Sequence, residues 1–357
     1  MMGSNEPLNV LDLPKIYQKP TYEDLKSVLE KLKVAPPTWT GKPSQPLVVG
    51  DSKAISGYLS LIISNGLNWF SNDGVNEDLA MERREEIWDD ASRRIAERCG
   101  RSAMPEMTRD WQIPYEGHPD LSLTIREPPL TGDNLGFKTW GTAFTMSKEL
   151  APLKTQYLSH LFHDSQLPRV LELGSGTGLV GLAASAIWRC HVLLSDLPEI
   201  CSNLARNIDE NIEEIRTRGG DASCQALDWT LAPSNDSRYD FSLPELGENS
   251  SEIGFQSSQM HQVVIAADSL YDTQHPALVA DMIANYQAPG KESRALVAVP
   301  LRDEHTQRLA THLRELLEQG GRFHVLAEGE WICFDDWESA DQKDGDGVRC
   351  WWAVFGR

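Results

Sequence analysis

The sequence lacks the features that mark membrane and secreted proteins. It contains no run of about eighteen apolar residues, the length that a helix needs to cross a bilayer. The first residues, Met1 to Pro7, carry neither a basic region nor an apolar core, so we expect no secretory signal. These absences predict a cytoplasmic protein that makes no contact with membranes.

Cysteine is scarce, and its spacing is uninformative. The six cysteines are scattered along the chain, and no two of them form a CxxC pair. This pattern argues against a zinc site and against a disulfide framework, and it fits a reducing compartment. We therefore expect no bound metal.

Basic residues are also in deficit. The chain has 33 Lys and Arg against 53 Asp and Glu, which gives a formal net charge of −20. Such a charge repels nucleic acid phosphate, so we expect no direct nucleic acid partner. It suits a cationic partner such as an exposed lysine on a protein, although acidic residues also serve solubility alone.

The clearest positive feature is a glycine-rich turn between an apolar strand and a small-residue helix. Residues 170–179 read Val-Leu-Glu-Leu-Gly-Ser-Gly-Thr-Gly-Leu, so Gly174, Gly176 and Gly178 alternate with other residues. A strand, glycine turn and helix in succession present backbone N–H groups to a nucleotide-like ligand. Glycine is needed where the backbone takes a positive φ or passes too close to a ligand for a Cβ.

The spacing of this turn separates two classes of cofactor. A dinucleotide-binding turn has the pattern GxGxxG, whereas this one is GxGxG with an acid, Glu172, two residues before it. A carboxylate there disfavours a pyrophosphate but favours the methionine ammonium of S-adenosylmethionine. About eighteen residues after Gly178, the apolar run 191–195 ends in Asp196, which is placed to accept hydrogen bonds from ribose hydroxyls.

The chain divides by pattern into two parts. Strands and helices alternate from about residue 170 onward, which predicts an α/β, doubly wound, Rossmann-like sheet within a domain at 131–357. Residues 1–130 form a mainly helical extension. The polar stretch at about 232–259 is predicted to be a surface insertion.

Three helices are expected in the extension, at 22–33, 55–70 and 76–98. The first begins after Thr21, which can cap it together with Asp24. The last has acids in its first turn and arginines at its end, which matches the helix dipole. Its buried face is predicted to contain Leu79, Ile87, Trp88, Ala91 and Ile95.

Tryptophans and acids stand at two further points near the core strands. The strand predicted at 225–229 ends in Asp228 and Trp229, which are placed to contact an adenine ring. Trp140 and Gly141 open a helix directly before the first core strand. We expect Trp140 to wall the cofactor pocket, the alternative being an ordinary core tryptophan.

These separated motifs, taken in order, resemble the family 16 class I methyltransferases of the seven-strand fold. The motifs are Trp140-Gly141, the glycine turn with Glu172, Asp196, Asp228-Trp229, and Asp268-x-x-Tyr271. The resemblance covers about residues 130–357 and implies a sheet with strand order 3-2-1-4-5-7-6 and S-adenosylmethionine as methyl donor. The long extension and the Cys-Trp-Trp ending are similar to fungal protein-lysine methyltransferases of translation elongation factor 2.

The resemblance implies a set of site residues. Asp268 and Tyr271 are expected to be catalytic, because D-x-x-Y marks the active site of the family. The residues expected to bind the cofactor are Trp140, Glu172, Gly174, Ser175, Gly176, Gly178, Asp196, Asp228, Trp229 and Ala267.

Methyl transfer to lysine needs an unprotonated amine in line with the sulfonium carbon. Because Asp268 ends a buried strand predicted at 261–268, we expect it to accept a hydrogen bond from the attacking nitrogen, while Tyr271 lines the channel. The alternative for D-S-L-Y is a helix cap and a packed tyrosine.

Three functions remain open when the residues and the resemblance are taken together. The first is a monomeric protein-lysine methyltransferase acting on an elongation factor. The second is a methyltransferase of small molecules or RNA, against which the acidic composition counts. The third is a cofactor-binding scaffold with vestigial catalysis, against which the intact D-x-x-Y counts.

Overall fold

The chain folds into two compact units, which are treated separately. The computed structural model describes residues 8–33, 48–49, 52–72, 76–98, 106–115, 117–129, 135–163, 167–231, 260–334 and 347–357. The first unit ends at Glu106 and the second begins at Met107. This division lies earlier than the boundary at 130 expected from the sequence. The insertion predicted at 232–259 lies outside the described residues.

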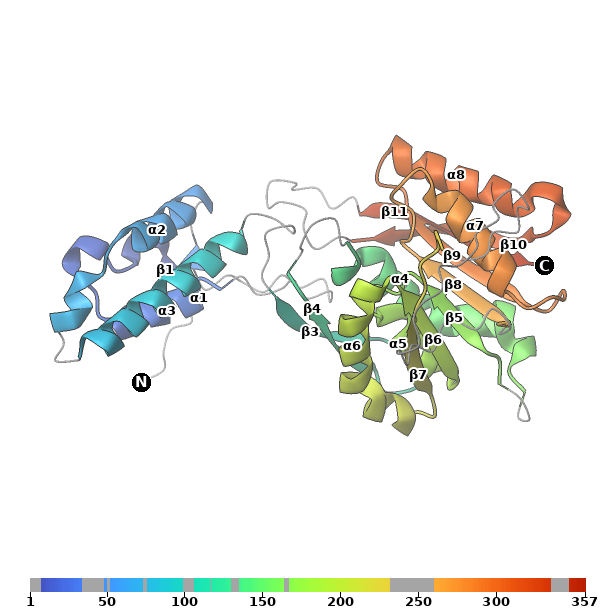
Figure 1. The fold of residues 1–357 in the computed structure, drawn as a ribbon, viewed down its shortest axis with the longest axis horizontal. Coiled ribbons are helices and arrows are strands. Elements are labelled where there is room, and N and C mark those ends of the chain that lie inside the picture. The colour runs from blue at the N-terminus through green and yellow to red at the C-terminus, as the bar shows by residue number, and fades with distance from the viewer. Residues whose placement is uncertain are drawn as a thin grey trace, which may run out of the picture. The chain divides into compact units, whose positions relative to one another are not determined.

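The first unit is helical, as expected. Its main helices are α1 (Tyr22–Lys31), α2 (Ser52–Ser64) and α3 (Glu77–Ala96), with a short parallel pair of β1 (Leu8–Asn9) and β2 (Val48–Val49) (Figure 1). The predicted cap of α1 is confirmed, because Asp24 N donates to Thr21 Oγ1 and Thr21 N donates to Asp24 Oδ2, each at 3.1 Å. The core of this unit is formed by apolar side chains such as Leu25, Leu29, Leu59 and Ile87.

One residue of α3 differs from its prediction. Leu79, which we expected on the buried face, is 38% exposed, whereas Ala80 is fully buried. The helix begins at Glu77, and its buried positions follow Ala80 at intervals of three or four residues, so Leu79 lies outside that stripe. Asn76 caps the helix by accepting from Leu79 N at 2.8 Å.

The second unit is built on a seven-stranded sheet with the order β10-β11-β9-β8-β5-β6-β7. Numbered from its first core strand, this order is 3-2-1-4-5-7-6 read from the other edge, so the predicted fold class is confirmed. All neighbouring strands are parallel except where β11 pairs with β9 and β10. The strands are β5 (Val170–Leu173), β6 (His191–Asp196), β7 (Asp221–Ala226), β8 (Val263–Ala267), β9 (Arg294–Pro300), β10 (His324–Cys333) and β11 (Val348–Gly356).

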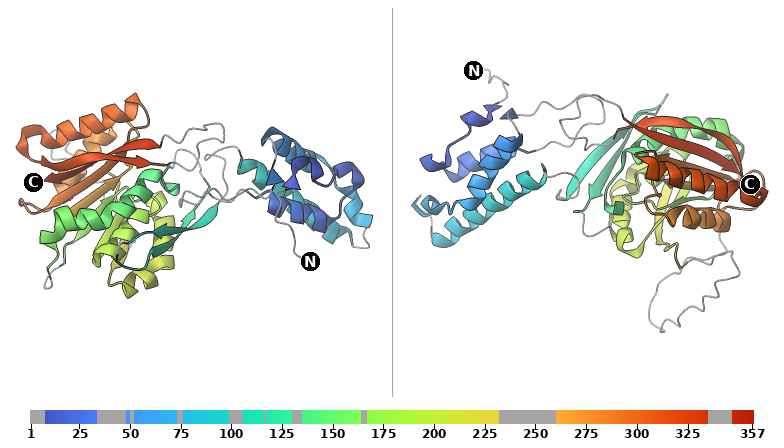
Figure 2. Two further views of the ribbon diagram at one scale, coloured as in Figure 1. Left: turned by 180° about the vertical axis from the view of Figure 1, so that it is seen from behind. Right: turned by 90° about the horizontal axis from the view of Figure 1, so that it is seen from above.

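Helices cover both faces of this sheet. Figures 1 and 2 show α4, α5 and α6 on one face and α7 and α8 on the other. Apolar side chains of α7 and α8 pack against the central strands in one cluster of the core. The helices are α4 (Gly141–Leu153), α5 (Leu179–Trp188), α6 (Pro198–Thr217), α7 (His275–Tyr286) and α8 (Glu304–Glu318). No described helix combines the length and the apolar character that crossing a membrane requires.

A hairpin of β3 (Met107–Ile113) and β4 (Leu121–Glu127) is joined to α6 by asparagine side chains. Arg126 N donates to Asn207 Oδ1 at 2.9 Å, and one turn later Thr124 N donates to Asn211 Oδ1 at 2.8 Å. Asn211 Nδ2 returns a bond to Thr124 O at 2.8 Å. These amides satisfy a strand edge that would otherwise be open, which explains why the hairpin belongs to the second unit.

The register of the parallel strands brings the motifs to one edge of the sheet. Leu173 of β5 lies opposite Ser195 of β6 and Ala266 of β8. The residues at the carboxyl ends of these strands, including Gly174 after β5, Asp196 at the end of β6 and Asp268 after β8, therefore lie side by side. This carboxyl edge is where open α/β sheets bind ligands.

Candidate active site

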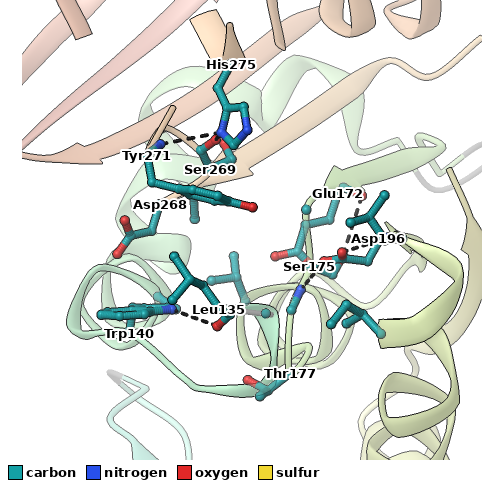
Figure 3. Close-up of a pocket in the computed structure, with 18 of the residues that line it drawn as sticks. Leu135, Trp140, Glu172, Ser175, Thr177, Asp196, Asp268, Ser269, Tyr271 and His275 are labelled. Atoms are coloured by element: carbon teal, nitrogen blue, oxygen red, sulfur yellow. Dashed lines mark hydrogen bonds between the residues drawn. The ribbon is translucent and has the colours of Figure 1, made fainter. Parts of the chain in front are cut away.

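A cavity of about 260 Å³ opens at the carboxyl edge of the sheet. Figure 3 shows side chains from the ends of several strands converging on it. Every predicted site residue except Gly178 lines this cavity. The cavity is also lined by residues that the sequence did not single out. Among them, Lys138 and Arg302 carry a charge, His275 carries a ring, and Thr177 carries a hydroxyl.

The glycine turn has the backbone that its sequence predicts. Gly174, Gly176 and Gly178 have φ values of 64°, 55° and 92°, in the left-handed region that favours glycine. A Cβ on Gly178 would lie 2.6 Å from a methyl carbon of Leu204 on α6. Gly178 thus allows α5 to start close against α6, and it shapes the turn without lining the cavity.

Asp196 is held by the backbone around it. Its Oδ2 accepts from Gly176 N and its Oδ1 from Leu197 N, both at 2.7 Å. Burial raises the pKa of the Asp196 carboxyl, while the two backbone bonds act in the opposite direction. Each carboxylate oxygen has a second lone pair, so the side chain can still accept from hydroxyls of a ligand.

Glu172 is the least satisfied acid of the cavity. Its side chain is buried, and its Oε2 has no hydrogen-bond partner among the described residues. Burial raises the pKa of the Glu172 carboxyl to about 8. A buried acceptor with an open lone pair indicates a missing donor, and an ammonium group of a ligand would supply one.

Asp228 and Trp229 follow β7 in a turn instead of ending the strand, because β7 runs from Asp221 to Ala226. Asp228 Oδ1 accepts from Thr230 N at 2.9 Å and from Thr230 Oγ1 at 2.7 Å. The expected strand at 225–229 was therefore misplaced. Both side chains nevertheless line the cavity, and Trp229 lies 3.2 Å from where a Cβ of Gly174 would be.

Asp268 follows β8 and has an unusual backbone. Its φ is +54°, which is uncommon for a residue other than glycine and typical of functional sites. Its N–H donates to Ala298 O of β9 at 2.9 Å, which holds this conformation. Both carboxylate oxygens accept from one guanidinium: Arg302 Nη1 to Oδ1 at 3.0 Å and Nη2 to Oδ2 at 2.8 Å.

Tyr271 and His275 form an aromatic wall over the cavity. Their rings meet edge to face with centroids 4.2 Å apart, and Tyr271 is 52% exposed. Partial burial, followed by the charges of nearby acids, raises the pKa of the Tyr271 phenol, so it remains protonated at neutral pH. Burial lowers the pKa of His275, and its Nδ1 lies 3.1 Å from Ser269 O.

A buried charge cluster adjoins the cavity. Lys138 Nζ and Arg109 Nη2 lie 4.0 and 3.6 Å from Glu127 Oε2, and all three side chains are at most 5% exposed. Thr139 connects the cluster to the glycine turn, because its N–H donates to Glu127 Oε1 and its hydroxyl lies 2.8 Å from Thr177 Oγ1. Of these residues, Lys138 and Thr139 line the cavity, so the cluster supports one wall of it.

The sequence offered a weak signal for the cluster and for Arg302. Lys138 directly precedes the Thr139-Trp140 pair, and Arg302 stands two residues after β9, at the same sheet edge as Asp268. When an acid follows one strand and a cation follows the neighbouring parallel strand, the two side chains are candidates to pair. Among the described residues, no three His, Cys, Asp or Glu side chains gather in a way that could hold a metal.

Comparison with known proteins identifies close relatives. A family model described as lysine methyltransferase matches residues 118–243. Protein-lysine N-methyltransferase rrg1 of Schizosaccharomyces pombe is 31% identical over 84% of this chain and 84% of its own length. Protein-lysine N-methyltransferase EFM2 of Saccharomyces cerevisiae is 31% identical over 74% of this chain and 58% of its own length. EEF1A lysine methyltransferase 3 of Xenopus tropicalis is 36% identical over 21% of this chain and 32% of its own length.

Proposed function

This chain belongs to the lysine methyltransferase family, and from that premise we propose that it methylates a lysine of translation elongation factor 2 in the cytoplasm. The enzyme class is the one that the names of its relatives give, protein-lysine N-methyltransferase, and the methyl donor is S-adenosylmethionine. Support for an elongation factor comes from the Xenopus relative, whose name gives EEF1A as its substrate. The resemblance of the long extension and the Cys-Trp-Trp ending favours elongation factor 2.

The observation that carries the proposal is a single cavity with two chemically different ends. Figure 3 shows Glu172, Ser175 and Asp196 on one side and Asp268 and Trp140 on the other. The first side has acceptors for an ammonium and for ribose hydroxyls. The second has an acid and aromatic rings, which suit an amine. A nucleotide that carries a cationic amino acid group can therefore bind at one end of this cavity, and the side chain of a substrate lysine can enter at the other.

The residues present fit S-adenosylmethionine group by group. The open Oε2 of Glu172 would accept from the methionine ammonium, and the buried cation of Lys138 would attract the methionine carboxylate. Asp196 would hold the ribose, while Asp228 and Trp229 would contact the adenine. The cofactor supplies a methyl group on a sulfonium, which is already a good leaving group.

The remaining task of the protein is to present a neutral amine. A free lysine has a pKa of about 10.4, so forming its neutral amine at pH 7 costs roughly 4–5 kcal/mol. A channel walled by Trp140 and Tyr271 removes water from the amine, which disfavours its charged form. Asp268 would accept a hydrogen bond from the nitrogen and aim its lone pair at the methyl carbon.

A labelling experiment tests the proposal. Purified protein, tritiated S-adenosylmethionine and purified elongation factor 2 or EEF1A are incubated, and the labelled lysine is mapped by mass spectrometry. We expect label on elongation factor 2 alone, and none with the Asp268→Ala variant.

Other patterns of label separate the remaining alternatives. Label on EEF1A alone would overturn the acceptor but keep the enzyme class. In a whole lysate, label confined to RNA or small molecules would favour a methyltransferase of small molecules or RNA. The absence of any transfer would favour a cofactor-binding scaffold with vestigial catalysis.

A further inference from the structure

The Asp268–Arg302 pair joins the ends of two neighbouring strands, β8 and β9. One guanidinium fork binds both oxygens of one carboxylate, at 3.0 and 2.8 Å. Such a bidentate pair fixes the orientation of a carboxylate as well as its position. The Asp268 side chain is 7% exposed and that of Arg302 is 28% exposed, so the pair faces the cavity from a partly desolvated position.

Arg302 is also placed over an aromatic ring of the same cavity. Its Cζ lies 5.0 Å from the centroid of the Trp140 ring, which is within the range of a cation–π contact. Arg302 therefore connects the tryptophan before α4 to the acid after β8. The three side chains come from segments far apart in the chain, and together they form the Asp268 end of the cavity.

The charge balance at this end follows from the groups that face it. The other ionisable groups that line the cavity are Lys138, Glu172, Asp196, Asp228, Tyr271 and His275. The buried thiol of Cys350, on β11, also interacts with the charge of Asp268. Figure 3 shows Glu172 and Asp196 across the cavity from Asp268, so at the Asp268 end the charge of the acid is opposed by Arg302.

An isolated carboxylate beside a lysine would hinder the reaction. A negative charge within a few ångströms of an amine favours its ammonium form, which has no lone pair for attack. A carboxylate paired with a guanidinium still has lone pairs that can accept a hydrogen bond from the amine. The net charge of the pair is zero, so the pair does not favour the ammonium.

We propose that Arg302 is a positioning residue that orients the Asp268 carboxylate and cancels its charge, so that the acceptor amine reaches the methyl group unprotonated. This inference rests on the proposed methyltransferase function. Arg302, which follows the neighbouring strand β9, would thus act together with the D-x-x-Y residues. Without this cation, Asp268 would favour the protonated form of the substrate amine.

Sinefungin tests this without an identified acceptor protein. It replaces the sulfonium and its methyl group by a carbon bearing an amine, so its amine reports the charge preference at the point of transfer. Calorimetry compares the affinity of sinefungin with that of S-adenosylhomocysteine, which lacks this amine. Titrations in buffers of different ionisation enthalpy measure the protons released on binding, a quantity that a purely structural role of Arg302 would not change.

The variants give opposite expectations. The wild-type protein should release one proton more on binding sinefungin than on binding S-adenosylhomocysteine at pH 7, because the additional amine binds neutral whereas any proton lost from Glu172 is common to both ligands. Arg302→Gln should lose this release and favour sinefungin over S-adenosylhomocysteine by at least about tenfold more than the wild type does. Arg302→Lys, which keeps the charge, should stay near the wild type, and Asp268→Asn should shift the preference away from sinefungin.

A matched control is Arg308→Gln, an exposed arginine on α8 whose partner is Glu304 at 3.7 Å, and it should change neither measurement. If Arg302→Gln still binds S-adenosylhomocysteine and its preference for sinefungin is unchanged, the proposed role of Arg302 is overturned, while the proposed function stands. Failure of the wild-type protein to bind S-adenosylhomocysteine would instead overturn the proposed function.

Discussion

Asn207 of α6 donates its side-chain amide to the carbonyl oxygen of Thr177 in the glycine turn, at 2.9 Å. The same Nδ2 lies 3.1 Å from Arg126 O, and its Oδ1 accepts from Arg126 N. One buried amide thus joins the hairpin, the helix and the turn that shapes the cofactor end of the cavity. The turn is held by a residue about thirty positions away, which no local pattern indicates.

Replacing Asn207 by Ala should destabilise the protein by about 1–3 kcal/mol, because it leaves a buried N–H and a carbonyl without partners. It should also weaken binding of S-adenosylhomocysteine, because the turn loses its tie to α6. Chemical denaturation and calorimetry measure the two effects. Glu210→Ala, an exposed change one turn along α6, is the control; equal effects of both variants would contradict the joining role.

The Gly178→Ala variant should be strongly destabilised. A residue other than glycine at φ +92° costs about 1–2 kcal/mol, and the added Cβ would also meet Leu204 at 2.6 Å. Gly320→Ala isolates the first cost, because Gly320 has φ +72° with nothing within 4 Å of an added Cβ. Denaturation curves should therefore show a loss for Gly178→Ala that exceeds the loss for Gly320→Ala by at least about 1 kcal/mol. Equal losses would show that contact with Leu204 is unimportant.

Glu172 should make stability depend on pH in the absence of cofactor. Its pKa is about 8 in the folded protein and about 4.5 in the unfolded chain, so between these values the folded state binds the extra proton. Raising the pH through this window should therefore lower the free energy of unfolding by at most about 5 kcal/mol.

The Glu172→Gln variant should remove most of that slope, because glutamine does not titrate. Urea denaturation at pH 5, 6, 7 and 8 measures the free energy of unfolding of the wild type and of the variant. The difference between the two pH dependences isolates the contribution of Glu172 from that of other acids such as Asp196. Parallel curves for the two proteins would mean that Glu172 is ionised in the folded state throughout this range.

Asp268→Asn should separate binding from catalysis. The amide loses the charge that pairs with Arg302 and accepts more weakly from an amine, so single-turnover methyl transfer should fall by at least about 100-fold. Binding of S-adenosylhomocysteine should stay within a few-fold, since Glu172 and Asp196, which are expected to hold its ammonium and its ribose, lie across the cavity from Asp268. Asp209→Asn, on the exposed side of α6, serves as the control. Normal turnover with lost cofactor affinity would reverse the assignment of Asp268.

Several local predictions rest on physics that acts over a few residues. The glycine turn after β5 could be predicted because GxGxG encodes positive φ values, and the cap of α1 because Thr21 and Asp24 stand three residues apart. The misplaced end of β7 shows the limit of such patterns. Asp228 bonds to its own neighbour Thr230, and this local turn competes with continuation of the strand.

The sequence by itself determined which residues could lie at the carboxyl ends of the strands. Gly174, Asp196 and Asp268 each follow an apolar run, and such runs can be recognised because backbone sterics and periodicity act locally. Tertiary structure alone decided what these residues meet. Arg302 reaches Asp268 because β9 lies beside β8, and Asn207 reaches Thr177 because α6 lies against the start of α5. Such contacts depend on strand order and helix packing, which are set by burial over the whole chain.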